Sequence, residues 1–363
     1  MDIAILGLPR SGKTTVFNAI TRGVARNVDY VGQSKPNIAV TKVPDSRLTI
    51  LRKLYEPKRV VQAEVRYLDM PNPPEELGKG ISGQFLNRLQ LADALLVVSR
   101  AFDDPSVSHV MDTVDFIRDI DTILYELAFA DIEILDKRIE RIKEKMKSTK
   151  SNERSGFTQE IEVILGIRNG LEEGKYIRDN DLKPNERAVI EGFGLLTAKP
   201  VVVTVNIDEG QKASHMPSQD KLIALGSERG VLVSDICGKL EKDLAEMAPE
   251  DEQQFREAMG LGESSLGQII RLSYEALNLI TFFTASEEEI RAWPVPKCTT
   301  AGRAAGKIHT DLERGFVRAE TVSLKDLERL GSLAEVRKYG LLRQEGKGYF
   351  INDSDVINIL HNV

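Results

Sequence analysis

Apolar residues come in short blocks along the chain, and several of these blocks predict buried strands. Ile3 to Leu6, Ala94 to Ser99 and Val201 to Val205 are almost unbroken apolar runs. Such runs are typical of strands that are covered on both faces of a parallel sheet. Segments with helical spacing lie between them, including Thr15 to Thr21 and Phe85 to Leu91. This alternation predicts an α/β fold with a mostly parallel sheet.

The pattern changes between residues 120 and 190, where apolar positions are spaced by three and four as in a coiled coil. The positions are Ile132, Leu135, Ile139, Ile142 and Met146. After a polar turn at 148–156, a second helix is expected to pack back antiparallel through Phe157, Ile161, Ile164 and Leu171. Acidic residues are interleaved with the basic ones on the outer faces. Two interpretations of this projecting helical hairpin therefore stay open, namely a surface that binds phosphate and a solvated amphipathic face.

The last part of the chain reads as a small β-grasp-like domain, with one helix near Leu324 to Leu330. Its short β-like runs are Thr281 to Ala285, Trp293 to Val295, Phe316 to Thr321 and Tyr349 to Ile351, followed by a closing run at Val356 to Leu360. The chain is thus predicted to divide into four segments. Residues 1–120 and 191–278 are the two parts of the first domain. Residues 121–190 are a hairpin insertion between them, and residues 279–363 are the β-grasp domain.

Composition narrows the class of protein. The 363 residues are 29% charged and 41% hydrophobic with a net charge of −7, so any contact with nucleic acid needs a local basic patch. Cys237 and Cys298 are far apart, which fits a reducing compartment without disulfides. Met1 leads directly into the first predicted strand, and no apolar run approaches the ~18 residues of a spanning helix. We expect a cytoplasmic protein without a membrane partner.

The segment after the first predicted strand has the spacing of a phosphate-binding loop, G-x-x-x-x-G-K-[ST], at Gly7, Gly12, Lys13 and Thr14. Glycines let successive backbone N–H groups turn toward phosphate oxygens, and the following helix adds its positive dipole end. Lys13 would reach the β- and γ-phosphates and act in catalysis. The predicted phosphate contacts are Pro9, Arg10, Ser11, Gly12, Lys13, Thr14 and Thr15. The alternative is a glycine-rich turn that binds nothing.

Two oxygen-bearing side chains are candidates for a Mg²⁺ site. The Thr14 hydroxyl would ligate the ion directly. The predicted strand at Val65 to Leu68 ends on Asp69, whose carboxylate would hold a water on the metal. Asp69 as a cap of the next turn is the alternative. A nucleoside triphosphate with Mg²⁺ is the cofactor set that these residues suggest.

The nucleotide base is expected at the tips of two later strands. The first tip follows Val201 to Val205, and the second follows Val231 to Val233. Both tips lie at the ligand edge in a doubly wound sheet. The predicted contacts are Asn206, Ile207, Glu209, Cys237 and Gly238. A strand-end turn that does not discriminate between bases is the alternative.

With these residues assembled, the chain resembles the YchF or Obg-like ATPase family, a branch of the translation-factor class of P-loop proteins, over essentially its full length. The resemblance also rests on Val43 to Leu48, Gly80 to Leu86, Arg100 to Asp104 and a specific C-terminal block from Phe282 to Asp311. It implies a nucleotide-dependent switch that hydrolyses ATP slowly and also accepts GTP. It further implies a TGS-like C-terminal domain that, with the helical arm, contacts the ribosome or its RNA. A monomer is expected.

The base preference follows from one altered motif. Guanine-specific relatives carry Asn-Lys-x-Asp, whose aspartate accepts two hydrogen bonds from guanine, whereas this chain has Asn206-Ile207-Asp208-Glu209. Asn206 can still meet N7, which adenine and guanine share, but the longer Glu209 is not placed to clamp guanine in the same way. The resembled family prefers ATP or accepts both bases, and we expect the same here.

Two switch positions depart from the family pattern. Gln33 stands where a threonine normally reaches Mg²⁺, and Asn72, flanked by prolines, replaces the glycine of Asp-x-x-Gly. These changes predict weaker sensing of the γ-phosphate. His109 matches a histidine of the family and is a candidate for positioning the attacking water, although a lone histidine is more often structural. A barely hydrolysing adaptor that uses nucleotide for stability is therefore the alternative to the ATPase switch.

Overall fold

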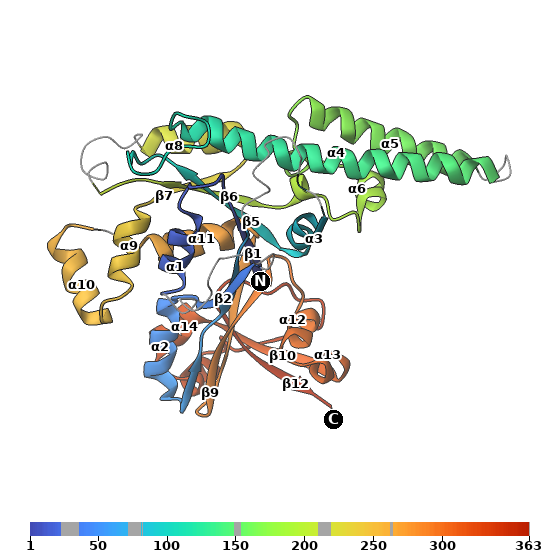
Figure 1. Cartoon of the computed structure of the whole chain (residues 1–363). Coiled ribbons are helices and arrows are strands. Elements are labelled where there is room, and N and C mark those ends of the chain that lie inside the picture. Colours follow the sequence, from blue (N-terminus) through green and yellow to red (C-terminus); the bar gives the residue numbers. More distant parts are fainter. Residues whose placement is uncertain are drawn as a thin grey trace. The chain divides into compact units, whose positions relative to one another are not determined.

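The structure is a computed structural model (Figure 1) that describes residues 1–22, 36–71, 81, 83–148, 154–209, 219–261 and 264–362. Contacts divide the chain into two compact units. Unit 1 consists of Met1–Thr41 and Arg66–Leu272, and unit 2 consists of Lys42–Val65 and Ser273–Val363. Each unit has its own sheet.

The sheet of unit 1 has the strand order β2-β4-β1-β5-β6-β7. Its strands are β1 (Asp2–Leu6), β2 (Asn37–Lys42), β4 (Glu64–Asp69), β5 (Ala94–Arg100), β6 (Val201–Asn206) and β7 (Leu232–Ile236). All pairs from β4 across to β7 are parallel, as predicted. Because β4 lies on one side of β1 and β5 on the other, β1 is the topological switch point, where such sheets bind ligands.

Strand β2 is not among the strands predicted from the sequence. The residues of β2 alternate strictly between buried and exposed, and Ile38 and Val40 are on the exposed face. This strand lies at the edge of the sheet, so only one of its faces is covered. Its mixed composition therefore gives a much weaker signal than the continuous apolar run of β5.

Helices surround this sheet and carry the rest of the unit 1 core. They are α1 (Lys13–Ile20), α3 (Gly83–Leu91), α6 (Pro184–Ile190), α8 (Gln219–Arg229), α9 (Gly238–Leu244), α10 (Pro249–Ala258) and α11 (Ser265–Ala276), with short 3-10 turns η2 (Ile177–Asp179) and η3 (Leu196–Ala198). Buried Arg256 of α10 joins this helix to α9 through an ion pair with Glu241 (2.5 Å) and also pairs with Glu252 within α10 (3.0 Å). Within the described ranges no helix has both the length and the apolar content that crossing a bilayer requires.

The predicted helical hairpin is confirmed as α4 (Phe116–Ser148) and α5 (Arg154–Glu172), which run side by side in Figure 1. Helix α4 has 33 residues and is therefore about 50 Å long. Its distal half packs on α5, and Arg138–Glu160 (2.5 Å) and Arg168–Asp136 (2.6 Å) are ion pairs between the helices. Most of the turn predicted at 148–156 cannot be compared, because residues 149–153 lie outside the described residues.

The hairpin is continuous with the core of unit 1. Ile120, Leu124 and Leu127 in the first half of α4 are buried in the same apolar cluster as Leu95 and Val97 of β5. The predicted segment boundary at 121 thus falls inside a helix that begins at Phe116. A single long helix therefore connects the sheet to the distal end of the arm.

Asp131 anchors α4 to the body of unit 1. The side chain is fully buried, and its carboxylate accepts hydrogen bonds from Leu196 N (2.8 Å), Thr197 N (2.7 Å) and Thr197 Oγ1 (2.6 Å). Burial raises the pKa of Asp131 to about 6, while the hydrogen bonds from Thr197 and Leu196 oppose this rise. The first turn of η3 is thereby capped by a residue of a distant helix.

This raised pKa predicts a specific pH dependence of stability. Between about pH 4 and pH 6 the folded protein keeps the Asp131 proton that the unfolded chain has lost, so stability falls by roughly 3 kcal/mol as pH rises. Asp131→Asn removes this dependence, and Glu140→Gln, an exposed change on the same helix, retains it. Urea unfolding followed by circular dichroism measures the difference. If the difference in unfolding free energy between the wild type and Asp131→Asn does not vary with pH, the three hydrogen bonds offset the effect of burial on the pKa of Asp131.

Unit 2 contains a six-stranded mixed sheet with the order β11-β10-β12-β8-β9-β3. Its strands are β3 (Arg59–Val61), β8 (Leu279–Ala285), β9 (Glu289–Pro296), β10 (Phe316–Ser323), β11 (Arg343–Glu345) and β12 (Asp355–His361). Its helices are α2 (Ser46–Tyr55), α12 (Ala301–Ile308), α13 (Thr310–Arg314), α14 (Leu324–Leu330) and α15 (Leu333–Lys338). The prediction of one helix in the C-terminal segment was wrong. The strand predicted at Tyr349 to Ile351 is also wrong, because only Phe350 forms an isolated bridge there.

Residues 42–65 belong to unit 2, which the predicted segment boundaries did not include. Strand β3 pairs in parallel with β9, and Arg47 of α2 holds the same segment in place. The Arg47 guanidinium bonds to Asp45 and to Asp353, each at 2.8 Å, and lies 5.0 Å from the centre of the Phe283 ring. The Val43 to Leu48 motif therefore has a structural role, because Asp45 also caps α2 by accepting from Arg47 N.

Removal of the Arg47 contacts should destabilise unit 2 selectively. Arg47→Met leaves Asp45 and Asp353 without their cation and should cost about 1–3 kcal/mol. The single tryptophan of the chain, Trp293, lies in β9, so its fluorescence during urea unfolding reports on this unit. Arg52→Ala, an exposed change on the same helix, is the control. An unchanged midpoint for Arg47→Met would mean that the backbone pairing of β3 alone holds the segment.

Candidate phosphate-binding site

The loop between β1 and α1 is closed tightly by two glycines. A Cβ at Gly7 would lie 2.5 Å from the carbonyl oxygen of Val98 and 2.6 Å from Ser11 Oγ. Gly12 has φ +88°, and a Cβ there would lie 2.2 Å from Asn206 Nδ2. Only glycine fits at either position without displacing a neighbour. The sequence motif therefore corresponds to a compact loop that is held against β5 and the end of β6.

Lys13 and Ser11 place polar groups inside this loop. The Lys13 side chain is buried, and its ammonium donates to the Gly7 carbonyl at 3.2 Å. Burial lowers the pKa of Lys13 to about 8, and the negative charge of Asp69 opposes this shift. Ser11 Oγ is also buried and has no hydrogen-bond partner among the described residues. A bound polyphosphate supplies both groups with the oxygen acceptors and negative charge that they need.

Thr14 and Asp69 meet at the carboxyl ends of adjacent strands. The Thr14 hydroxyl donates to Asp69 Oδ2 at 3.2 Å, and Asp69 is opposite Ile5 in the β1–β4 register. Asp69 is 2% exposed. The described residues contain no group of three or more histidine, cysteine, aspartate or glutamate side chains that could hold a metal alone. Two hard oxygen donors fit Mg²⁺, which usually completes its coordination with phosphate oxygens and water.

Asn206 connects the phosphate loop to the segment after β7, where Cys237 and Gly238 are predicted to contact the base. Its amide nitrogen donates to the Ser11 carbonyl at 3.1 Å, and its oxygen accepts from Gly238 N, also at 3.1 Å. Cys237 is fully buried beside it. The structure thus brings Asn206, Cys237 and Gly238 together with the phosphate loop. The side chain of Asn206 serves as a brace between two loops.

The remaining predicted base contacts differ in exposure. Ile207 is buried, and its N–H donates to the Ile236 carbonyl at 2.8 Å. Glu209 is exposed and is the last residue described before 210–218.

Pro9, Arg10 and Thr15 lie in or directly after the loop, whereas Gln33 and Asn72 of the two altered switch positions lie outside the described residues.

Arg100 and Phe102, for which the sequence predicts no role, pack against the loop. The Arg100 guanidinium lies 4.4 Å from the centre of the Phe102 ring, and its Nε donates to the Phe102 carbonyl at 3.1 Å. The Phe102 ring edge is 3.8 Å from the Cβ position of Gly12. The available signal was an arginine at the end of an entirely apolar strand, because such a buried charge must have a dedicated partner.

The residue before His109 contacts the phosphate loop, whereas the His109 ring bonds to residues outside that loop. Arg10 donates to the carbonyl of the preceding Ser108 at 3.0 Å. The imidazole is buried, with Nε2 2.8 Å from Asp119 Oδ2 and with Nδ1 accepting from Met111 N at 3.1 Å. Since a backbone N–H requires a lone pair on Nδ1, the ring proton is on Nε2 and is donated to Asp119. Both ring nitrogens are therefore engaged within the protein.

The parallel sheet with β1 at its switch point, the glycine-closed loop, the buried lysine and the Thr14–Asp69 pair define a P-loop nucleotide-binding fold. Comparison with known proteins agrees. The family model for the C-terminal region of YchF GTPases, described as a protein of unknown function, matches residues 279–362. The solved structure of the Schizosaccharomyces pombe YchF GTPase matches with a TM-score of 0.86 and 32% identity, covering 99% of this chain and 97% of that chain.

Curated relatives align over nearly the whole length. The ribosome-binding ATPase YchF of Bacillus subtilis is 37% identical over 370 residues, which cover 100% of both chains. The Escherichia coli O157:H7 protein of the same name is 34% identical over 362 residues, covering 99% of this chain and 98% of that protein. The chain belongs to the YchF family.

The lowered pKa of Lys13 predicts that nucleotide binding takes up protons. Near pH 8 the free protein has a partly neutral Lys13, and a bound polyphosphate favours the charged form. Mg·ADP affinity should then fall above pH 8 by at most roughly tenfold per pH unit. Calorimetric titration in buffers of different ionisation enthalpy measures the uptake, roughly half a proton at pH 8 and almost none at pH 6.5.

The matched variant for this experiment is Lys13→Arg, whose guanidinium stays charged throughout the pH range. Its residual affinity should lose the dependence on pH. Wild-type binding at pH 8 without proton uptake would mean that Lys13 is already fully charged in the free protein.

Proposed function

We propose that this protein is a slow ATPase that also accepts GTP and works as a nucleotide-dependent switch on the ribosome. The observation that carries the nucleotide part is the buried ammonium of Lys13, in a loop that only glycines can close and in which Ser11 Oγ has no partner among the described residues. The relatives at 34–37% identity are named ribosome-binding ATPases, which supports the rest.

We propose that Mg²⁺ is held by Thr14 directly and by Asp69 through water. Their oxygens are 3.2 Å apart at the edge of the sheet where the loop begins. When bound, the ion neutralises charge that develops on the transferred phosphoryl group. Lys13 acts beside it on the phosphate oxygens. The loop from Pro9 to Thr15 surrounds the phosphates, and its backbone N–H donors begin at Arg10, because proline has no N–H.

For the base we propose contacts from Ile207, Glu209, Cys237 and Gly238, with Asn206 fixing the positions of these segments. Asn206 already bonds to Ser11 and Gly238, so its contribution to the base is mainly through the position of the loops. Glu209 offers a flexible, exposed carboxylate. We expect ATP to be preferred over GTP without strict exclusion of GTP.

The proposed catalytic role of His109 requires a change in ring orientation. In the described structure its imidazole bonds to Asp119 and Met111, so it cannot orient a water without giving up one of these partners. This observation also favours the second candidate function, an adaptor that binds nucleotide but barely hydrolyses it. The two functions differ in turnover and in the effect of nucleotide on ribosome association.

We propose that the helical arm and the C-terminal domain contact the ribosome and its RNA. We also propose that the protein works as a monomer in the cytoplasm. The distal half of α4 carries exposed lysines, including Lys137, Lys143 and Lys147. Acidic neighbours pair with some of them, for example Lys137 with Glu133 and Lys147 with Glu144. The arm thus has reach but no net positive charge, because α4 and α5 together carry 11 acidic and nine basic side chains.

Phosphate release from ATP, combined with sedimentation of ribosomes, tests the proposal. Wild-type turnover should disappear in Lys13→Ala, and ribosome association should depend on whether ATP analogue or ADP is present. His109→Ala should lower turnover while leaving nucleotide affinity nearly unchanged, since its ring lies outside the phosphate loop. Asp119→Asn is the control for loss of the buried pair.

The adaptor function would be supported by a different set of results. It requires phosphate release no greater than that of Lys13→Ala, together with ribosome association that is equal in both proteins. A protein that hydrolyses ATP but never sediments with ribosomes would remove the ribosomal part of the proposal and leave the ATPase.

A further inference from the structure

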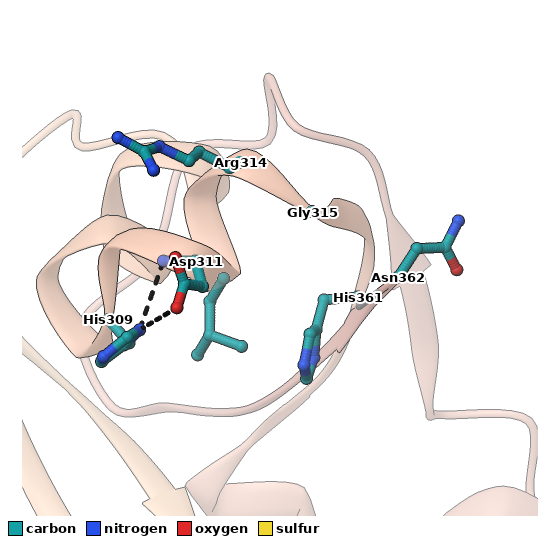
Figure 2. A pocket seen from close by; sticks show the side chains of 7 residues that line it. His309, Asp311, Arg314, Gly315, His361 and Asn362 are labelled. Atoms are coloured by element: carbon teal, nitrogen blue, oxygen red, sulfur yellow. Dashed lines mark hydrogen bonds and ion pairs between the residues drawn. The ribbon is translucent and has the colours of Figure 1, made fainter.

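A cavity of about 490 Å³ opens in unit 2 where α13 meets the end of β12 (Figure 2). Its lining includes His309, Asp311 and Arg314 from the α13 region and His361 from β12. His309 and Asp311 belong to the C-terminal block that supports the family resemblance. The nucleotide site lies in unit 1, so the ATPase function gives this cavity no task.

Backbone contacts at Gly315 fix the shape of the cavity. Gly315 N donates to the Asp311 carbonyl at 2.8 Å, and Asn362 N donates to the Gly315 carbonyl at 2.9 Å. A Cβ at Gly315 would lie 2.2 Å from the Asn362 carbonyl oxygen. The helix end and the strand end are therefore locked together, and the cavity is formed before any ligand arrives.

Several hydrogen-bond donors around the cavity face solvent, because the His309 side chain is 64% exposed and Arg314 and His361 are exposed as well. His309 Nδ1 accepts from Asp311 N at 3.2 Å and caps α13, so its ring proton is on Nε2 in the neutral form. Within the described part of the chain, that Nε2 has no protein partner, and neither do the side chains of His361 and Arg314. In Figure 2 the two imidazoles lie on two sides of the opening, and the Arg314 side chain points away from them, beyond the helix ribbon.

The lining combines flat rings, a cation and an apolar contact with the Asp311 carboxylate, whose Oδ2 lies 3.3 Å from His309 Nδ1, and this combination points to one class of ligand. Single-stranded RNA is recognised by stacking of unpaired bases on aromatic rings, histidine included, and by cationic contacts with phosphate. The cavity has the size of small-molecule sites, about 300–1,000 Å³, and the half-buried Leu312 adds an apolar contact for a base. An acidic peptide side chain would need only a point charge and would leave both imidazole faces unused.

We propose that this cavity binds one unstacked nucleotide of RNA, with the base against the imidazoles of His309 and His361 and a phosphate at Arg314. The proposal rests on the proposed ribosome association and names the kind of RNA element that unit 2 would recognise. An exposed base in a loop or bulge has the required geometry, whereas bases in a duplex are stacked and unavailable.

Fluorescence anisotropy of the full-length protein with a short labelled single-stranded RNA tests this site. His309→Asn removes the ring but keeps an N-cap acceptor for Asp311 N, and His361→Thr substitutes a residue suited to a strand. Each should weaken RNA binding by roughly fivefold to a hundredfold, the range for loss of one base-stacking side chain. Tyr339→Ala, which removes an exposed aromatic ring of unit 2 outside the cavity lining, should have no effect.

Arg314→Gln separates the phosphate contact from stacking. Loss of one phosphate contact on a single strand should reduce the slope of log affinity against log salt concentration by about 0.7. The histidine variants should leave this slope unchanged. A duplex of the same sequence should bind more weakly to the wild type than the single strand does, and equal binding would overturn the stacking proposal.

Ribosome sedimentation of the same variants keeps the two proposals separate. If the wild type sediments with ribosomes but RNA affinity is unaffected by either histidine variant, the cavity proposal is wrong and the proposed function stands. If RNA is not bound at all but the histidine variants sediment poorly, the occupant is a protein and the nucleotide proposal is wrong. If the wild type does not sediment, the ribosomal function fails, and the RNA titration alone decides on the cavity.

Discussion

The amide of Asn206 is the contact on which the arrangement of the nucleotide site depends. It bonds to the carbonyl of Ser11 and to the backbone N–H of Gly238, so it fixes the phosphate loop relative to the loop after β7. Its nitrogen occupies the space that any side chain at Gly12 would need. The glycine is thus required by its neighbour as well as by its own backbone conformation. Residues more than 190 positions apart are in this way held as one rigid edge of the sheet.

Buried charges are placed according to their tasks. Burial lowers the pKa of Lys13 to about 8, and a bound anion would favour its charged form. Asp131 is equally buried but receives hydrogen bonds from two backbone N–H groups and one hydroxyl, as expected of a structural carboxylate. Arg47 has two carboxylate partners and an aromatic ring. The contrast between a buried ammonium in a glycine-closed loop and a carboxylate with three hydrogen-bond donors separates a candidate ligand site from an anchor.

The parts that the sequence predicted well are those with local or strongly periodic signals. The strands β1, β5 and β6 are continuous apolar runs, the arm has a regular seam, and the phosphate loop follows a fixed spacing. Strand β2 was missed because an edge strand with one covered face has a mixed composition. Residues 42–65 were assigned to the first domain because strand pairing with β9 is not encoded in any local pattern.

Side-chain partners were the least predictable part of the site. Nothing near His109 in the sequence indicates that its ring bonds to Asp119, because this pairing depends on where α4 begins. Asn206 was expected at the base, and its observed contacts with Ser11 and Gly238 depend on how two loops approach each other. The cluster of His309 and His361 joins residues from a helix start and a strand end, which only the folded sheet brings together.

Construction of unit 2 from two distant chain segments has a consequence for biosynthesis. Strand β3 pairs with β9 across a separation of about 230 residues. At 5–20 residues per second, roughly 10–50 s pass between translation of the first partner and of the second. During that time α2 and β3 emerge without the sheet that receives them, while most of unit 1 can already fold. The nascent chain therefore carries an unpaired strand for most of its synthesis, and this strand is a natural point of contact for a chaperone.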